Sequence, residues 1–585
     1  MIEPRRPWLL PEPLPEPPRF AGFGPAVATL LARRDIRDQA HLDRFLGAGQ
    51  LHPLTAMADA EEALARIDAA IARGERIAIW GDYDADGMTA VAVWTLALRA
   101  LGADPVRHVP SRLAEGYGVS VAGLRSLRER GLDLVVTCDC GVASVDEIGE
   151  ARSLGIDVVV TDHHLPGPVL PAAIAVVDPH RPDCHYPDPD LTGAGLAWKL
   201  ASALVERHGI AVPDLAGVAA IGTIADVAPM TGESRVIVQR GLAELGRTQR
   251  AGLRALLQRA CEHPEAPTAR DIAMSIAPRI NAAGRIAEAE LAMDLLVEED
   301  PVRAEALADE LEGVHLRRRE LTTIAVDAAT AMVDALPPAR GPLALRNDEW
   351  PAGIVGLVAG RLADRLGRPV AAVTLVGDEL RGSVRAPADF HVAQSLGAVA
   401  GHLTKRGGHA AAGGFSCHPA AWDGFVAAWQ ELPQPFGEAQ ISTITPQGGL
   451  VIDLVVPARL VGWPLIGELE RLAPFGPGHP EPLLAIAGLT VGDARRVGAD
   501  GRHLSLRMRR GPETIDAVAF GHPVDAPLPE VGESVDLVGT LERDTWQGEA
   551  RFRIRIVDLA HAAVSPLRDR RRMPITVAAT AVAAG

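Results

Sequence analysis

Three short apolar runs in this chain each stop directly at acidic or imidazole side chains. The runs are 76–80, 134–137 and 158–160, and the clusters that follow them hold Asp82, Asp84 and Asp86, then Asp139, then Asp162, His163 and His164. A short apolar, β-branched run that ends at a polar turn is typical of a buried parallel strand. Ligands of open α/β sheets bind at the carboxyl ends of the strands. We therefore expect these side chains to converge on one small volume.

The converging side chains favour a pair of divalent metal ions. Capping of a helix N-terminus explains one of the aspartates, but it does not explain the whole set. Carboxylates crowded in one crevice repel one another and raise each other's pKa unless cations neutralise them. Oxygen ligands with one or two imidazoles suit Mn²⁺ or Mg²⁺, and two such ions can activate a water for attack on a phosphate. Asp226, which ends the small-residue run Gly222–Ala225, is a further but weaker acidic candidate.

The chain predicts an α/β protein of several domains. Strand-like and helix-like segments alternate first, a long helical stretch follows, a second α/β segment comes next, and short runs broken by Gly, Pro and Asp indicate a small all-β barrel. The expected limits are a Pro-rich arm with helices over 1–60, a doubly wound parallel-sheet domain over 61–250, a helical connector over 251–335, a smaller α/β domain over 336–435, the barrel over 440–562 and a disordered tail over 563–585.

Charge and composition narrow the function classes. The net charge of −17 argues mildly against a nucleic-acid partner. Two barrel strands, however, alternate arginines with apolar residues, which suits a phosphate backbone; the arginines are Arg507 and Arg509 in one, and Arg551, Arg553 and Arg555 in the other. The five cysteines fit neither a disulfide framework nor a zinc ribbon. No apolar run is long enough for a membrane span and no apolar leader is visible, so we expect a cytoplasmic protein that does not bind membranes.

Together these motifs resemble the DHH phosphoesterase family, and most closely its RecJ branch of single-strand-specific 5′→3′ DNA exonucleases. The motifs that carry the resemblance are Gly81–Gly87, Thr137–Gly141, Thr161–His164 and Gly222–Val227. Further stretches are similar to RecJ proteins: Val109–Gly118, Asp178–Cys184, Pro278–Arg285, the Gly-Gly-His motif Gly407–His409 of a DHHA1 domain, and Leu472–Gly478 before an OB-fold. The resemblance covers about residues 20–560.

The resemblance implies a role for each candidate residue. Two ions, Mn²⁺ or Mg²⁺, would be bound or supported by Asp82, Asp84, Asp86, Asp139, His163 and Asp226, with Asp84, Asp139, His163 and His164 as the catalytic set. Whether His164 contacts the scissile phosphate or only supports the ligands stays open, as does which of the first three aspartates touch metal. Residues that would contact phosphate, or brace the site, are Arg112, Arg279, Asn281, Arg285, Ser383, Arg385, Gly408 and His409. Strand contacts in the barrel would come from Arg507, Arg509, Arg551, Arg553 and Trp546, although Trp546 fits a packed rim residue equally well.

The resemblance also implies partners and leaves alternatives. The substrate would be single-stranded DNA with a 5′ end, in repair and recombination, with single-strand-binding protein and a RecQ-type helicase as partners. Apart from the resemblance, a chain with two lobes around its own groove needs no second copy, so we expect a monomer. The alternatives are a DHH phosphoesterase acting on nanoRNA, cyclic dinucleotides or pyrophosphate, and an inactive DHH relative that only binds DNA. Departures from the family pattern stand at Ser234, His315, Ala386 and His479.

Overall fold

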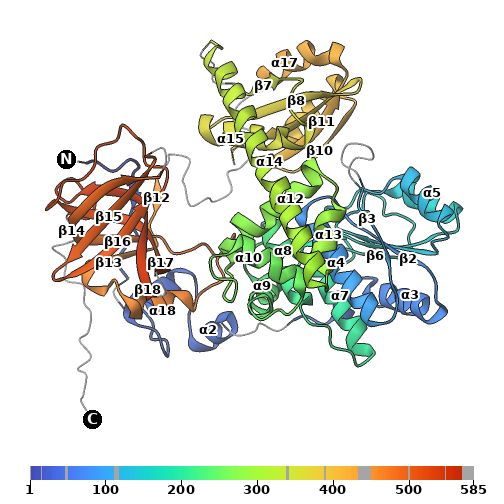
Figure 1. Ribbon diagram of the computed structural model, residues 1–585, viewed down its shortest axis with the longest axis horizontal. Coiled ribbons are helices and arrows are strands. Elements are labelled where there is room, and N and C mark those ends of the chain that lie inside the picture. Colours follow the sequence, from blue (N-terminus) through green and yellow to red (C-terminus); the bar gives the residue numbers. More distant parts are fainter. Residues whose placement is uncertain are drawn as a thin grey trace. The chain divides into compact units, whose positions relative to one another are not determined.

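The structure, a computed structural model, describes residues 2–14, 16–46, 51–110, 118–337, 341–387, 390–432, 449–498, 501–546 and 549–568, without the side chains of 545, 546 and 549. Its residues fall into two units. The barrel unit comprises 1–49, 441–475 and 480–585, and the two-sheet unit comprises 50–440 and 476–479. Figure 1 labels the elements of both units.

The first sheet of the two-sheet unit is parallel throughout, in the strand order β3-β2-β4-β5-β6. Its strands are β2 (Ile77–Trp80), β3 (Val106–His108), β4 (Leu134–Cys138), β5 (Asp157–Thr161) and β6 (Ala175–Val177). Helices cover both faces, as the apolar runs predict. One face packs against α3 (Ala60–Arg73), α4 (Ala85–Ala100) and α7 (Gly193–Arg207), and the other against α5 (Val121–Glu129) and α6 (Val145–Ser153). Behind the first face, α8 (Leu215–Ala225) packs on α4 and α7, and α9 (Gly232–Leu245) packs on α8.

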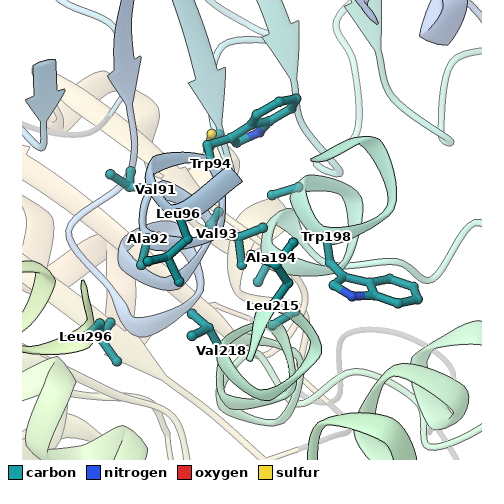
Figure 2. Close-up of a cluster of buried hydrophobic side chains, with 14 of the residues drawn as sticks. Val91, Ala92, Val93, Trp94, Leu96, Ala194, Trp198, Leu215, Val218 and Leu296 are labelled. Carbon is teal, nitrogen blue, oxygen red and sulfur yellow. The ribbon is translucent and has the colours of Figure 1, made fainter. Parts of the chain in front are cut away.

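Helix α4 forms the centre of this core. Every residue from Ala85 to Leu98 is buried, which is characteristic of a helix that is apolar on all sides. Val93 of α4 lies near Ala194 of α7 and Leu215 of α8 in the buried cluster that Figure 2 shows. The N-terminus of α4 is thereby held rigidly at the carboxyl edge of the sheet, where the acidic motifs lie.

A set of helices connects the two sheets. It consists of α10 (Ala251–Ala260), α11 (Ala269–Asp271), the π-helical turn η2 (Ile272–Ile276), α12 (Ala277–Ile286), α13 (Glu290–Val297) and the long α14 (Pro301–Asp334). Pro301 stands in the first turn of α14 and Asp300 caps it by accepting the N–H of Arg303, a favoured start for a helix. Among the described residues no helix has both the length and the apolar character needed to cross a bilayer.

The second sheet has the order β10-β11-β9-β8-β7, with one parallel pair and antiparallel pairs elsewhere. Its strands are β7 (Leu343–Arg346), β8 (Val370–Val376), β9 (Glu379–Arg385), β10 (Lys405–Gly408) and β11 (Ala412–Cys417), accompanied by α15 (Val355–Leu366), α16 (Val392–Ala398) and α17 (Trp422–Gln430). The result confirms the smaller α/β domain expected from the sequence.

The barrel unit closes five strands on themselves through the pairing of β14 with β17. Its elements are β13 (Leu454–Pro457), α18 (Trp463–Glu470), β14 (Leu484–Val497), β15 (His503–Arg510), β16 (Glu513–Ala519), β17 (Ser534–Trp546) and β18 (Glu549–His561). The apolar residues of the alternating strands fill the interior, including Leu504, Leu506 and Met508 on β15. The expected β-barrel is confirmed.

The N-terminal segment belongs to the barrel unit rather than standing apart from it. Strand β1 (Trp8–Leu9) pairs in parallel with β12 (Leu450–Val451), and Trp8 Nε1 donates to Asp558 Oδ2 at 2.9 Å. Helices α1 (Pro25–Arg33) and α2 (Gln39–Leu46) contribute to the same core as the barrel strands. Leu567 is fully buried beside Trp8, so the unit continues beyond residue 562, the limit expected from the sequence. The rest of the expected tail, 569–585, lies outside the described residues.

Candidate metal centre

The first acidic motif is positioned by the N-terminus of α4. Asp84 is the N-cap, and its Oδ1 accepts the backbone N–H groups of Asp86 (3.0 Å) and Gly87 (3.1 Å). Asp84 therefore fulfils the capping role considered for one aspartate. It also lies in a group of potential metal ligands with Asp82 and Asp139.

Asp86 points from the first turn of α4 to the N-terminus of another helix. Its carboxylate accepts the N–H of Gly193 at 2.7 Å and that of Ala194 at 3.0 Å, both in the first turn of α7. Backbone N–H groups at a helix N-terminus stabilise a negative charge. The sequence alone did not identify this contribution of α7. The available signal was a helix N-cap, Thr192, followed by the stretch Gly-Ala-Gly.

Asp139 follows β4 in the left-handed region, with φ of 61°, a conformation that Asp adopts more readily than most residues. The backbone of α7 passes unusually close to it. A Cβ on Gly193 would lie 2.5 Å from Asp139 Cβ, so only glycine allows this approach. Asp139 Oδ1 lies 2.9 Å from His163 Nε2.

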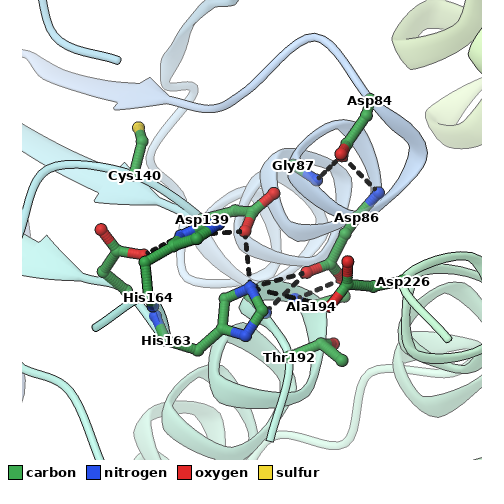
Figure 3. Close-up of polar contacts among 12 residues, drawn as sticks. Asp84, Asp86, Gly87, Asp139, Cys140, His163, His164, Thr192, Ala194 and Asp226 are labelled. Carbon is green, nitrogen blue, oxygen red and sulfur yellow. Dashed lines mark hydrogen bonds and ion pairs between the residues drawn. The ribbon is translucent and has the colours of Figure 1, made fainter. Parts of the chain in front are cut away.

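His163 lies at the centre of the cluster. Its Nε2 is 2.9 Å from Asp139 Oδ1 and 3.8 Å from both Asp86 Oδ2 and Asp226 Oδ2. Asp226 is the C-cap of α8, so the acid that the sequence marked only weakly joins the cluster. Figure 3 shows these side chains converging from separate elements. Three overlapping groups of ligand atoms, each within 4.8 Å, comprise Asp82, Asp84 and Asp139; Asp86, His163 and Asp226; and Asp139, His163 and His164.

Asp162 organises the two histidines, although the sequence placed it only among the converging side chains and gave it no role of its own. Its Oδ1 lies 2.7 Å from His164 Nδ1 and accepts the backbone N–H groups of both histidines, while Oδ2 accepts the N–H of Val142 at 2.9 Å. The carboxylate thus fixes the ring of His164. Its position directly after a buried strand and before two histidines was the signal that could have identified it.

The electrostatics of the cluster fit hard divalent cations. Burial, and then the charges of neighbouring carboxylates, raise the pKa of Asp86 and Asp139 well above the usual range. Burial and Asp84 raise the pKa of Asp226 to about 6. Burial lowers the pKa of His163 to about 3, which leaves the imidazole neutral, as metal coordination requires. The donor set of carboxylates and a neutral imidazole is one that Mn²⁺ or Mg²⁺ favours.

The second sheet brings its own polar groups towards this cluster. The His409 ring stacks on the His164 ring, with centroids 5.7 Å apart and planes at 21°. Gly408, with φ of 143°, precedes it at the end of β10. On β9, Arg385 Nη1 donates to Ser383 Oγ at 2.8 Å. The guanidinium and hydroxyl to which the family resemblance assigns a phosphate contact therefore lie side by side.

The three candidates on α12 brace neighbouring elements. Arg279 forms a two-point ion pair with Glu312 of α14 and is largely buried. Asn281 Oδ1 accepts the N–H of Ala85 in the first acidic motif at 2.9 Å. Arg285 Nη1 donates to the Gly353 carbonyl before α15. The family resemblance implied that these residues either contact phosphate or brace the site. The contacts observed here are bracing contacts.

The barrel candidates differ from one another in their surroundings. Arg507 and Arg509 are exposed on β15, with Arg507 3.6 Å from Asp516. Arg553 on β18 forms ion pairs with Glu542 (3.3 Å) and Asp544 (3.4 Å), and Arg551 lies on the same strand. Arg112 and the side chain of Trp546 lie outside the described residues.

Comparison with protein-family models gives three matches: the DHH family, N-terminal domain, over residues 76–223; the DHHA1 domain over 326–432; and the RecJ OB domain over 452–558. RecJ of Bacillus subtilis strain 168 is 34% identical over 572 residues, covering 95% of this chain and 70% of that protein. RecJ of Escherichia coli K12 is 33% identical over 566 residues, covering 92% and 96%.

The chain belongs to the RecJ family.

Solved RecJ structures agree with this assignment. RecJ of Thermus thermophilus in complex with Mn²⁺ matches with a TM-score of 0.75 and 33% identity, covering 92% of this chain and 76% of that one. The same protein in complex with Mg²⁺ gives a TM-score of 0.70 and 31% identity, covering 92% and 74%. Both metals expected from the sequence thus occur in crystallised RecJ, and the RecJ-family chain described here places acidic and histidine side chains in position to hold metal.

Proposed function

We propose that this chain is a single-stranded-DNA-specific exonuclease that removes 5′-mononucleotides in the 5′→3′ direction, in DNA repair and recombination. The relatives quoted above carry the name single-stranded-DNA-specific exonuclease. The observation that carries the proposal is the arrangement around His163, whose Nε2 has three aspartate carboxylates within 3.8 Å. Carboxylates from the end of β4, the first turn of α4 and the C-terminus of α8 meet there around one neutral imidazole.

Two ions would share these ligands. Asp82, Asp84 and Asp139 would hold one, and Asp86, His163 and Asp226 the other, with Asp139 close enough to His163 to serve both. When bound, the ions would lower the pKa of a water and neutralise charge on the scissile phosphate. The fixed carboxylates and the N-terminus of α7 keep the ligands in place before substrate arrives, so little reorganisation is needed during reaction.

The histidines would handle the phosphate. Asp162 binds Nδ1 of His164, which leaves Nε2 as the ring's other polar atom for a phosphate oxygen. His409 stacks against the same ring and would approach the phosphate from the second sheet. Both residues would orient the substrate rather than hold metal.

Direction would be set at the second sheet. Ser383 and Arg385 form a hydroxyl–guanidinium pair on β9, and a guanidinium is well suited to bind phosphate through two hydrogen bonds. We infer that this pair, with Arg112, receives the 5′ end. An oligonucleotide labelled at either end tests this: 5′-labelled strands should lose label first as mononucleotide, and initial release of 3′ label would contradict the assigned direction.

The alternatives fit less well. An enzyme for nanoRNA or cyclic dinucleotides has no need of the RecJ OB domain matched over residues 452–558, and an inactive scaffold would not need the complete ligand set. A metal-supplemented digestion that compares single-stranded DNA, duplex and dinucleotide separates the three. Degradation confined to dinucleotides would favour the second function, and no hydrolysis in any metal would favour the third.

We further infer that the protein acts as a monomer in the cytoplasm, with single-strand-binding protein and a RecQ-type helicase as partners. The family resemblance supports the two partners. Light scattering of the purified chain tests the monomer, and co-purification with each partner tests the contacts.

A further inference from the structure

One short turn occupies an unusual place in the chain. Gly476–His479 belongs to the two-sheet unit, whereas the residues immediately before and after it belong to the barrel unit. The turn is closed by hydrogen bonds in both directions between Gly476 and His479, at 2.9 and 3.1 Å. His479 is buried, 4% exposed. It directly follows the motif that resembles the approach to an OB-fold, and the proposed function does not use it.

The turn packs on the loop that follows Asp226. The Met230 N–H donates to the Pro477 carbonyl at 2.6 Å. A Cβ on Gly476 would lie 3.2 Å from Met230 Cε, and one on Gly478 would lie 3.3 Å from Thr231 Cγ2 and 3.6 Å from Pro229 Cβ. The turn therefore contacts three consecutive residues, Pro229 to Thr231, that lead from Asp226 into α9.

The same loop holds a strained residue. Val227, directly after Asp226, has φ of 62°, a left-handed conformation that a β-branched residue rarely adopts. Hydrogen bonds from Val227 N to Ile224 O and from Ala228 N to Thr223 O close the end of α8 around it. Such strain persists only where the surrounding structure enforces it. The turn supplies contacts to Pro229–Thr231, the part of the loop that leads into α9.

We propose that the Gly476–His479 turn is a positioning element for Asp226, which it holds within reach of His163 and Asp86 by fixing the loop 227–231. This inference rests on the proposed function, because Asp226 is taken there as a metal ligand. The turn thus contributes indirectly to the metal centre of its own unit. The turn itself touches neither metal nor substrate.

Matched glycine substitutions in the full chain test the proposal. Gly478→Ala adds a methyl group at φ of +71° against Thr231, whereas Gly501→Ala adds one at φ of +66° with nothing within 4 Å. The backbone strain is similar, so only the contact differs. We expect Gly478→Ala to weaken Mn²⁺ binding by about tenfold, the usual effect of disturbing a ligand's support, and to lower kcat with an unchanged KM for a long strand. Gly501→Ala should leave all three unchanged.

A second substitution makes the effect specific. Thr231→Ser removes the methyl group that Gly478→Ala would meet, so the double variant should recover Mn²⁺ affinity. The proposal is overturned if Gly478→Ala binds Mn²⁺ as tightly as the parent. It is also overturned if Gly501→Ala loses as much Mn²⁺ affinity as Gly478→Ala. Calorimetry with Mn²⁺ alone needs no DNA, so the result is readable even if the parent shows no nuclease activity.

Amide exchange keeps the proposal testable if Gly478→Ala does not fold or the parent binds no Mn²⁺. The Met230 amide should be protected in the parent. Rapid exchange at that amide would show that the turn does not hold the loop. Absence of Mn²⁺ binding in the parent refutes the proposed metal centre, and with it the role of the turn.

Discussion

Asn281 and Ala85 lie 196 residues apart in the sequence, yet Asn281 Oδ1 accepts the Ala85 N–H at 2.9 Å. Ala85 stands between Asp84 and Asp86, so one side chain on α12 supports the loop that carries three candidate ligands. Next to it, Gly284 approaches the Tyr83 carbonyl so closely that a Cβ would lie 1.9 Å away. Helix α12 thus packs directly against the first acidic motif, which it contacts through Asn281 and Gly284.

Removing this support should weaken the metal centre without removing a ligand. Asn281→Leu leaves the Ala85 N–H without its acceptor, at a cost of about 1–3 kcal/mol. We expect weaker Mn²⁺ binding and a lower kcat, measured by calorimetry and single-turnover digestion. Asn281→Asp keeps the acceptor and should retain more Mn²⁺ affinity. An equal loss of Mn²⁺ affinity in the two variants would show that the hydrogen bond to the Ala85 N–H does not support the metal centre.

Asp139 is the ligand whose loss should be most damaging. Asp139→Asn should reduce Mn²⁺-dependent hydrolysis to background, while binding of single-stranded DNA in the absence of metal is retained. Because burial, and then the neighbouring carboxylates, raise the pKa of Asp139 in the metal-free protein, the metal-free variant should melt no lower than the parent. The increase in Tm that Mn²⁺ produces in the parent should disappear. Substantial hydrolysis by the variant would refute the assigned role.

Metal binding should depend on pH in a definite direction. The pKa of Asp226 is raised to about 6, and those of Asp86 and Asp139 are also raised, so the metal-free cluster retains protons that a cation must displace. Mn²⁺ affinity should therefore fall as the pH is lowered towards 6, with proton release on binding. Calorimetry in two buffers of different ionisation enthalpy measures this release; equal heats in both would contradict it.

The same pKa shifts determine whether the metal-free protein gains or loses stability as the pH rises. A carboxylate whose pKa is raised by folding favours the folded state while it is protonated. That advantage is lost as the pH rises from its ordinary value through the folded one. The metal-free protein should thus lose stability between the usual Asp range and about pH 6 through Asp226, and saturating Mn²⁺ should remove that loss. A pH series of thermal melts with and without Mn²⁺ gives the comparison.

Recognition of the 5′ end should depend on Arg385. Arg385→Ala removes the guanidinium that lies beside Ser383, so the preference for a 5′-phosphorylated strand over a 5′-hydroxyl strand should shrink. Arg381, on the same strand β9, provides a control, and Arg381→Ala should keep the preference. The ratio of kcat/KM for the two substrates is the measurement, and an unchanged ratio in Arg385→Ala would exclude the role.

The barrel arginines should contribute unequally to strand binding. Arg509 is exposed, whereas Arg553 is already paired with Glu542 and Asp544. Arg509→Ala should weaken binding of a long strand and reduce the slope of log affinity against log salt by roughly 0.7, the value for one phosphate contact on a single strand. Arg553→Ala should change the slope little. Cleavage of a dinucleotide should be unaffected by either change. A larger change of the salt slope in Arg553→Ala than in Arg509→Ala would contradict the assignment.

The sequence predicted those parts of the site that depend on local pattern. The apolar runs before Asp82, Asp139 and Asp162 are strands β2, β4 and β5, and their carboxyl ends meet because parallel strands share an edge. The long helix before the second sheet and the alternating barrel strands follow from periodicity in the same way. Pattern marked Asp226 only weakly, and the family resemblance gave it a metal role; Asp226 ends a helix and not a strand.

Contacts between distant segments could not be predicted from pattern. The pairing of Arg279 with Glu312 depends on how α12 packs on α14. The support of Asp86 by Gly193 and Ala194 depends on where α7 begins in space. The place of the N-terminal segment in the barrel unit depends on Trp8 and Asp558, which are separated by most of the chain.

That last contact has a consequence during protein synthesis. Residues 2–46 leave the ribosome before the two-sheet unit, and their partners on β12 and β18 leave it after that unit. The two-sheet unit can fold while the N-terminal segment is still waiting, and its apolar residues stay exposed throughout translation. The barrel unit therefore cannot be completed until β18 has left the ribosome.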